Sequence, residues 1–338
     1  MKIAVIGAGS WGTAMASQLA LKHDKVMLWA RNPEFAQAIQ SSRQNRSYLP
    51  DVILPPPVTC TASLSEAATG AELIILTTPS HAIRQTAAEL ASYVSPDAIA
   101  VSAAKGLESS TFKRMSQIIA EEIPQISGRV AAISGPNHAE EVSRNHPTAS
   151  VVAASCKTVA QAVQDAYMLP YFRVYTNPDL IGVELGGALK NIIALGAGIV
   201  EGLGFGDNTK AALMTRGLAE ITRLGTALGA SPRTFAGLAG IGDLIVTCTS
   251  RHSRNRRAGI LLAGGKGADE IQRETNMVVE GIRATAAAYE LAQRHGVVMP
   301  ITEQTWQVIY QKKSAKEAVM ELMTRSKTYE VEEMAQLS

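Results

Sequence analysis

Short runs of apolar residues recur along the first half of the chain, and stretches with helical periodicity separate them. The runs are rich in Val, Ile, Leu and Ala, a composition typical of strands that are buried on both faces. We predict strands at residues 2–6, 25–30, 58–61, 73–77, 98–102, 130–134, 149–153 and 172–175. Helices are predicted between them, among others at 13–21, 33–44 and 65–69. This alternation predicts an α/β fold with a doubly wound, mostly parallel sheet.

The pattern changes near Asn177-Pro178. From there on the sequence has helical periodicity, is rich in alanine and glycine, and contains few β-branched runs. We therefore predict two domains, a sheet-containing domain of residues 1–176 and an all-helical domain of residues 177–338, with a proline-punctuated loop at 48–57. The longest clearly apolar helical run, 192–200, is far shorter than the roughly 20 residues that span a bilayer, so we expect no membrane insertion.

A glycine motif, Gly7-Ala-Gly9-Ser10-Trp11-Gly12, lies between the first predicted strand and the first helix. The first glycine allows a tight turn, the second lets the backbone approach a pyrophosphate, and the third permits close packing of helix on strand. The helix N-terminus offers free N–H groups to the anion. We predict a Rossmann-type NAD(P)-binding domain, with an ordinary glycine turn of an α/β fold as the alternative. Trp11 lines the cofactor pocket in one interpretation and packs in the other.

Arg31 follows the second predicted strand, where the ribose of a bound dinucleotide is recognised. NAD-specific sites often place an acidic residue there, and this chain has none before Glu34. Because an arginine favours a 2′-phosphate, we predict that NADP(H) is preferred and NAD(H) accepted. The alternative is a surface arginine that lies over the adenine.

Charge and cysteine content narrow the range of functions. The chain has 32 Lys and Arg against 30 Asp and Glu, and a net charge of +2 gives no reason to expect nucleic acid or an acidic membrane as partner. Cys60, Cys156 and Cys248 have no paired spacing, which predicts reduced thiols in a cytoplasmic protein and no metal site. The N-terminus leads directly into the first strand, so we expect no signal peptide.

Two lysines are candidates for chemistry on a small carbonyl compound. Lys190 lies in the predicted helix 183–198, and Lys105 follows the predicted strand that ends at Ser102. On the helix, the residues three and four positions from Lys190 are Gly186, Gly187, Ile193 and Ala194. Their small side chains predict room for a small molecule. A dinucleotide motif followed by such lysines is typical of reductases.

A second polar segment, 240–257, follows in the helical half. Glycines precede Asp243, whose carboxylate is positioned to orient a lysine ammonium. Ser253, Arg254 and Asn255 then supply a hydroxyl, a planar guanidinium and an amide, a set that suits a phosphate monoester. A solvated basic turn and a nucleic-acid patch are the alternatives. The lack of interleaved aromatic residues counts against nucleic acid.

The chain resembles the bacterial-type NAD(P)-dependent glycerol-3-phosphate dehydrogenases nearly from end to end. The motifs that carry the resemblance are residues 7–14, 48–50, 104–108, 134–136 with 139–142, 187–194, 242–244 with 253–256, and 279–281. One departure is Asn137-His138, where the family often has a small hydroxyl residue followed by an aromatic one. We interpret His138 as a packed or surface residue in preference to a catalytic one.

The resemblance implies reversible hydride transfer between NAD(P)H and dihydroxyacetone phosphate, which gives sn-glycerol 3-phosphate for phospholipid synthesis. Lys190 would be the catalytic proton donor in reduction and would be hydrogen-bonded to Asp243. The implied substrate-binding residues are Lys105, Gly135, Asn137, Lys190, Asp243, Thr247, Ser253, Arg254 and Asn255. The implied cofactor-binding residues are Gly7, Gly9, Ser10, Trp11, Gly12, Arg31, Lys105, Ala139, Arg254, Val278 and Glu280. For Glu280 the alternative is a plain acid on a helix surface.

Two other functions stay open at this point. A reductase of the β-hydroxyacid or 6-phosphogluconate type would also need a helix lysine and an anion site. A redox-sensing module would bind the dinucleotide without turnover. The predicted apolar helical surface of the second half is compatible with a homodimer, with a monomer as the alternative.

Overall fold

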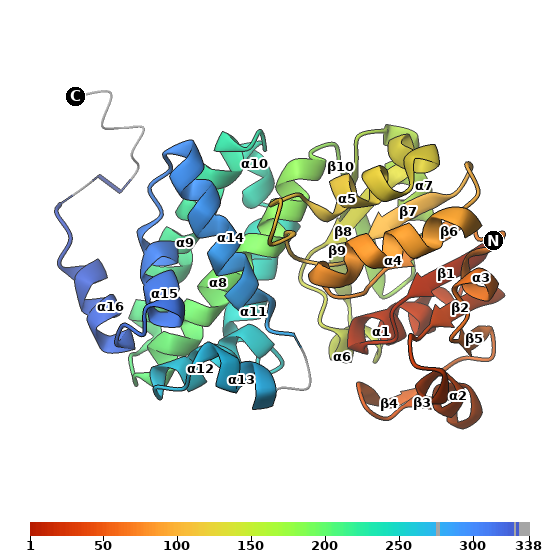
Figure 1. Ribbon diagram of the computed structural model, residues 1–338, viewed down its shortest axis with the longest axis horizontal. Coiled ribbons are helices and arrows are strands. Elements are labelled where there is room, and N and C mark those ends of the chain that lie inside the picture. Colours follow the sequence, from red (N-terminus) through yellow and green to blue (C-terminus); the bar gives the residue numbers. More distant parts are fainter. Residues whose placement is uncertain (275–277, 328, 331–338) are drawn as a thin grey trace.

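The computed structural model describes residues 1–274, 278–327 and 329–330 and consists of a sheet-containing half and a helical half (Figure 1). Within the described residues, eight strands form one sheet in the order β10-β9-β8-β7-β6-β1-β2-β5. Neighbouring strands run parallel except β8 and β9, which are antiparallel. The strands are β1 (Lys2–Ile6), β2 (Lys25–Trp29), β5 (Val58–Thr61), β6 (Leu73–Leu76), β7 (Ile99–Ser102), β8 (Val130–Ser134), β9 (Thr148–Ala154) and β10 (Phe172–Asn177). The predicted doubly wound fold is confirmed.

Both faces of this sheet are buried, which explains the continuous apolar runs. Ile3 and Val5 of β1 belong to one apolar cluster, whereas Ala4 and Ile6 belong to the other. The first cluster includes side chains of α1 (Ser10–Leu19), α2 (Pro33–Ser42) and α7 (Lys157–Tyr167). The second includes side chains of α3 (Leu64–Ala68), α4 (Ile83–Leu90) and α5 (Met115–Glu122). Shorter helical segments are α6 (Ala139–Val142), η1 (Ser80–Ala82), η2 (Ala91–Tyr93) and η3 (Pro124–Arg129).

The prediction of a loop at 48–57 is wrong. A two-stranded antiparallel sheet forms there from β3 (Gln44–Asn45) and β4 (Leu49–Ile53). Buried Asn45 donates hydrogen bonds to the carbonyl of Ala8 and the hydroxyl of Thr13, and Leu49 packs on Ala14. These contacts hold the two-stranded sheet against the glycine motif. They depend on residues that cannot be identified from the local proline-rich pattern.

The helical half surrounds one central helix, α8 (Leu180–Gly202) (Figure 1). No strand occurs among the described residues from 180 onward. The surrounding helices are α9 (Asp207–Ala227), α10 (Pro232–Phe235), a π-helical turn η4 (Leu238–Gly242), α11 (Asp243–Thr249), α12 (Arg254–Ala263), α13 (Ala268–Glu274), α14 (Glu280–His295), α15 (Pro300–Tyr310) and α16 (Ala315–Met323).

Helix α8 is longer than the sequence indicated. It has 23 residues, and among the described helices it alone is long and apolar enough to cross a bilayer. Its apolar stretch is nevertheless completely buried inside the protein. The apolar run 192–200 is shorter than the helix because Lys190 and Asn191 interrupt the apolar pattern. Both residues are nevertheless buried within α8.

Candidate active site

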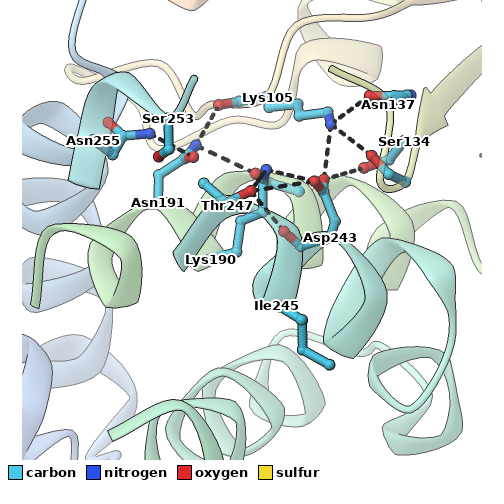
Figure 2. A network of polar contacts seen from close by, with 12 residues as sticks. Lys105, Ser134, Asn137, Lys190, Asn191, Asp243, Ile245, Thr247, Ser253 and Asn255 are labelled. Carbon is cyan, nitrogen blue, oxygen red and sulfur yellow. Dashed lines mark hydrogen bonds and ion pairs between the residues drawn. The ribbon is translucent and has the colours of Figure 1, made fainter. Parts of the chain in front are cut away.

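The ammonium of Lys190 is buried in the middle of α8 and faces the start of α11. Its Nζ donates a hydrogen bond to Oδ1 of Asp243 at 2.6 Å and a second one to the hydroxyl of Thr247. The side chains of Lys190 and Asp243 are only 6 % and 2 % exposed. Figure 2 shows the contact between them. The sequence prediction that Asp243 holds Lys190 is confirmed.

Lys105 reaches the same carboxylate from the other half of the molecule. Its Nζ donates to Oδ2 of Asp243 at 2.8 Å, to Oδ1 of Asn137 at 2.9 Å and to the carbonyl of Gly135 at 3.0 Å (Figure 2). The hydroxyl of Ser134 lies 3.5 Å from the same oxygen of Asp243. Asp243 therefore joins one lysine from the end of β7 to another from α8.

Burial and the neighbouring charges change the proton affinity of Lys190 and of Asp243. Burial lowers the pKa of Lys190 to about 8; repulsion from Lys105 lowers it as well, while Asp243 opposes the shift. Burial alone would raise the pKa of Asp243, but the two ammonium groups hold it below its usual range. The site thus holds an ionised carboxylate and a lysine that exchanges a proton near neutral pH.

The prediction that glycines on α8 leave room for a small molecule is wrong at the two positions next to Lys190. A Cβ on Gly187 would lie 2.7 Å from Oγ of Ser134 and 3.5 Å from Cγ of Lys105. A Cβ on Gly186 would lie 2.7 Å from the carbonyl oxygen of Ala239. The space beside these glycines is filled by other parts of the protein. Because Gly187 has no side chain, Lys105 can approach α8.

A chain of amides connects this network to α12, and its central member, Asn191, was missed by the sequence reasoning. Nδ2 of Asn191 donates to the carbonyl of Lys105 at 3.3 Å. Nδ2 of Asn255 donates to Oδ1 of Asn191 at 2.8 Å, and Oδ1 of Asn255 accepts from the backbone N–H of Gly281 at 2.9 Å. The available signal was a polar residue inside an otherwise apolar helix.

Within segment 251–257 a turn at 251–252 leads into α12, which begins at Arg254. Ser253 caps α12, because its hydroxyl oxygen accepts the backbone N–H of Arg256 at 3.2 Å. Arg254 is exposed at the first position of the helix, whereas Asn255 is buried. The first N–H groups of a helix have no acceptor within it, so this end can receive an anion.

The predicted substrate residues therefore fall into two groups. Hydrogen bonds bring Lys105, Gly135, Asn137, Lys190, Asp243 and Thr247 into one network, and Asn255 joins it through Asn191. Ser253 and Arg254 lie beside that network at the helix end. Thr247 points its hydroxyl toward Lys190, and Asn137 is held between Lys105 and the hydroxyl of Ser150.

The glycine motif has the geometry that a dinucleotide needs. Gly7 has a φ of +122°, and a Cβ on Gly12 would lie 1.9 Å from the carbonyl oxygen of Gly7. A Cβ on Gly9, in contrast, would meet nothing within 4 Å. Gly9 also caps α1 without a side-chain hydrogen bond, so the first N–H groups of α1 are open to a phosphate. These residues fit the group that the motif predicts.

The other predicted cofactor residues lie around this turn. Ser10 donates its hydroxyl to the carbonyl of Tyr48 at 2.8 Å, and Arg31 is exposed directly after β2. Trp11 is partly buried and packs on the apolar cluster that contains Ala139, the buried first residue of α6. Trp11 therefore has the packing contacts that the sequence left as an alternative.

Glu280 and Val278 come from the helical half. Glu280 begins α14, and its carboxylate accepts hydrogen bonds from the backbone N–H of Ser80 at 3.1 Å and the hydroxyl of Ser80 at 2.7 Å. Glu280 is thus a link between the two halves and not a plain surface acid. Val278 is half-buried two residues earlier.

Within the described ranges, no group of three or more His, Cys, Asp or Glu side chains is placed to hold a metal ion. Cys60, Cys156 and Cys248 are free thiols.

Known proteins match this chain over nearly its whole length. The family described as NAD-dependent glycerol-3-phosphate dehydrogenase matches through its N-terminus at residues 2–160 and through its C-terminus at residues 179–320. A protein of Moorella thermoacetica named glycerol-3-phosphate dehydrogenase (NAD(P)+) is 57% identical over 330 residues, which cover 98% of each chain. One of Desulfitobacterium hafniense with the same name is 55% identical over 337 residues, 99% of this chain and 94% of the other.

A solved structure agrees with these sequence matches. The crystal structure of glycerol-3-phosphate dehydrogenase from Coxiella burnetii has a TM-score of 0.91 and 37% sequence identity, and the match covers 96% of this chain and 99% of that one. The match includes both the sheet and the helices around α8, so it extends to the junction where the lysines meet. This chain belongs to the NAD-dependent glycerol-3-phosphate dehydrogenase family.

Proposed function

We propose that this protein is an NAD(P)-dependent dehydrogenase that interconverts dihydroxyacetone phosphate and sn-glycerol 3-phosphate, the latter for phospholipid synthesis. The observation that carries the proposal is the buried network of Lys190, Asp243 and Lys105 at the junction of the two halves. Family membership and the open glycine turn at Gly9 support it independently.

The nicotinamide supplies the hydride when it is bound, and the protein supplies position and protons. Lys190 donates the proton to the carbonyl oxygen during reduction and removes it during oxidation. Asp243 orients the ammonium through its hydrogen bond at 2.6 Å. Lys105 polarises the carbonyl and binds substrate, and Asn137 with Gly135 fixes its position. The lowered pKa of Lys190 suits a group that must both give and take a proton.

The N-terminus of α12 is the proposed phosphate site. Exposed Arg254 offers a planar guanidinium, and the helix end adds backbone N–H groups and the positive end of its dipole. Ser253 still has its O–H available as a donor, because its oxygen only accepts in the cap. Asn255 positions the helix through Asn191 and Gly281, and its second amide hydrogen remains for the substrate.

We propose that NADP(H) is preferred and NAD(H) accepted, because exposed Arg31 stands at the end of β2 where an acid would favour NAD. Trp11, Ala139, Val278 and Glu280 are the remaining proposed cofactor contacts. In the variant Arg31→Ala we expect the ratio of kcat/KM for NADPH over NADH to fall about tenfold, since one charge-assisted contact is lost. An unchanged ratio would remove Arg31 from the specificity site.

We place the boundary between the cofactor domain and the substrate domain in the short connection from β10 to α8. A cytoplasmic location is supported by the free thiols and by the burial of α8. A homodimer is supported by the exposed apolar side chains of Phe205 and Ile245 on the helical half. Mass measurement in solution tests the last point.

The function is tested by following NADPH oxidation with dihydroxyacetone phosphate and, separately, with unphosphorylated dihydroxyacetone. We expect efficient turnover only with the phosphorylated ketone. Tight NADPH binding without turnover of either ketone would favour another substrate, such as a β-hydroxyacid precursor, or a sensor. Equal turnover of both would contradict the phosphate site at α12.

A further inference from the structure

His138 lies next to the lysine network, and the proposed mechanism gives its side chain no role. Its backbone carbonyl begins α6 by accepting the N–H groups of Glu141 and Val142. Its ring atom Nε2 is buried and has no hydrogen-bond partner among the residues that the structure describes. Because a buried polar atom without a partner is costly, this nitrogen is available to a hydrogen-bonding atom from outside the chain.

The ring of His138 lies near the start of α12, the proposed phosphate site. Its centroid lies 6.2 Å from that of His252, with the ring planes inclined by 53°. His252 belongs to the helical half and directly precedes Ser253, the residue that caps α12. His138 belongs to the sheet half and directly follows Asn137, which binds Lys105. The His138 ring therefore lies close to the segment that begins α12, and its backbone directly follows the residue that binds Lys105.

Four charged groups on different segments act on the His138 ring. Lys190 on α8 and Lys105 after β7 repel a proton on the ring, while Glu140 on α6 and Asp243 on α11 attract one. Burial, the largest effect, and the two lysines together hold the pKa of His138 below its usual value of 6.5. The ring is thus neutral at pH 7 before the substrate binds, and a neutral ring can still donate one N–H.

We propose that Nε2 of His138 binds a phosphate oxygen of the substrate, so that His138 is a further specificity-determining residue of this enzyme. The proposal rests on the function proposed above. A dianionic phosphate favours the protonated ring. The proton affinity of His138 is then higher in the complex than in the free enzyme. At a pH between the pKa of His138 in the free enzyme and its pKa in the complex, the ring takes up a proton when the substrate binds. Substrate affinity therefore falls as the pH rises through this range.

Two substitutions separate hydrogen bonding from packing. His138→Phe keeps an aromatic ring but removes the donor, and we expect it to raise KM for dihydroxyacetone phosphate about ten- to hundredfold. His138→Gln keeps an N–H donor near the position of Nε2, so its rise in KM should be smaller. Neither change should alter kcat/KM for unphosphorylated dihydroxyacetone. His146→Gln, at an exposed histidine after the same helix, is the matched control and should leave KM unchanged.

Calorimetry measures the proton uptake that accompanies substrate binding. A purely structural role of His138 would not change this quantity. Dihydroxyacetone phosphate is titrated into the complex of enzyme and NADP⁺ at pH 7.5, where the phosphate is already dianionic because its second pKa is about 6. In buffers of different ionisation heat, the wild type should take up a fraction of a proton that His138→Gln does not. The folding of each variant is checked by its affinity for NADPH.

The outcomes are distinct. An unchanged KM in His138→Phe, equal losses with the phosphorylated and unphosphorylated ketones, or equal proton uptake in wild type and His138→Gln would each overturn the role of His138. If the wild type does not turn over dihydroxyacetone phosphate at all, the proposed function itself fails before any variant is compared.

Discussion

The glycine motif after β1 and the helix α8 are both rich in glycine, yet they use the missing side chain in opposite ways. At Gly9 the space is empty, since a Cβ there would meet no atom within 4 Å. On α8 the corresponding spaces are occupied by protein. A Cβ on Gly198 would lie 2.0 Å from the carbonyl oxygen of Arg256, and one on Gly202 would lie 2.6 Å from Cβ of Ala263.

The difference shows that glycine content does not by itself indicate a ligand site. In the turn, glycine leaves a surface for a pyrophosphate and permits a positive φ at Gly7. On α8, glycine lets α12 and the strand-end residue Ser134 approach the helix axis. The close packing at Gly198 also positions functional groups, because α12, which packs there, begins at the proposed phosphate site.

The largest effect is expected at the one lysine within this packed helix. Lys190→Ala should lower kcat about 10²–10⁴-fold, the usual contribution of a proton-transfer group, with a smaller change in KM. Steady-state kinetics of ketone reduction measure both values. Arg254→Ala should instead act mainly on KM, and Lys266→Ala, which removes a surface ion pair with Glu274, is the control. Equal, mild effects at Lys190 and Arg254 would contradict both assignments.

The packing use of glycine is tested at Gly198. Gly198→Ala should lower the free energy of unfolding by about 1–3 kcal/mol, because the new Cβ forces α12 away from α8. It should also raise KM for the phosphorylated ketone while NADPH affinity is kept. Denaturant titration and kinetics measure the two effects. Gly206→Ala, where a Cβ meets nothing within 4 Å, should change neither.

The ligand use of glycine is tested at Gly9. Gly9→Ala should weaken NADPH binding about ten- to hundredfold, since the methyl group keeps the pyrophosphate from the N–H groups of α1. Its free energy of unfolding should stay within about 0.5 kcal/mol of the wild type. Gly12→Ala, whose Cβ would collide with Gly7, should destabilise the fold instead. A fluorescence titration measures NADPH affinity and thermal unfolding measures stability. A destabilised Gly9→Ala variant would contradict the proposed difference between Gly9 and the packed glycines.

The remaining prediction concerns the dependence of the rate on pH. With the pKa of Lys190 lowered to about 8, its ammonium form is present below that pH and its amine form above it. Ketone reduction, which needs the ammonium, should slow about tenfold for each unit above pH 8, and alcohol oxidation should show the opposite trend. Rate profiles between pH 6 and 10 in both directions measure this. In Lys190→Ala both slopes should disappear; a slope that persists belongs to another group.

The sequence was sufficient for the sheet because its strands are buried on both faces, and burial leaves a continuous apolar run such as Ile3–Ile6. It failed at β4, where stability comes from Asn45 and its distant partners. The pairing of Lys190 with Asp243 could be expected because the glycines before Asp243 suit a carboxylate that orients an ammonium, and because the family resemblance implies this bond. The pairing of Asn191 with Asn255 could not be predicted, because the two residues are 64 positions apart and neither carries a charge that would identify its partner.

Asp243 holds one lysine from each half of the molecule, so the reaction centre exists only after both halves have folded and met. A chain that has completed the sheet but not the helices has the glycine turn, but it lacks the proposed proton donor and the carboxylate that binds it. We therefore expect incomplete copies of the chain not to oxidise NADPH. Catalytic competence reports the integrity of the whole polypeptide.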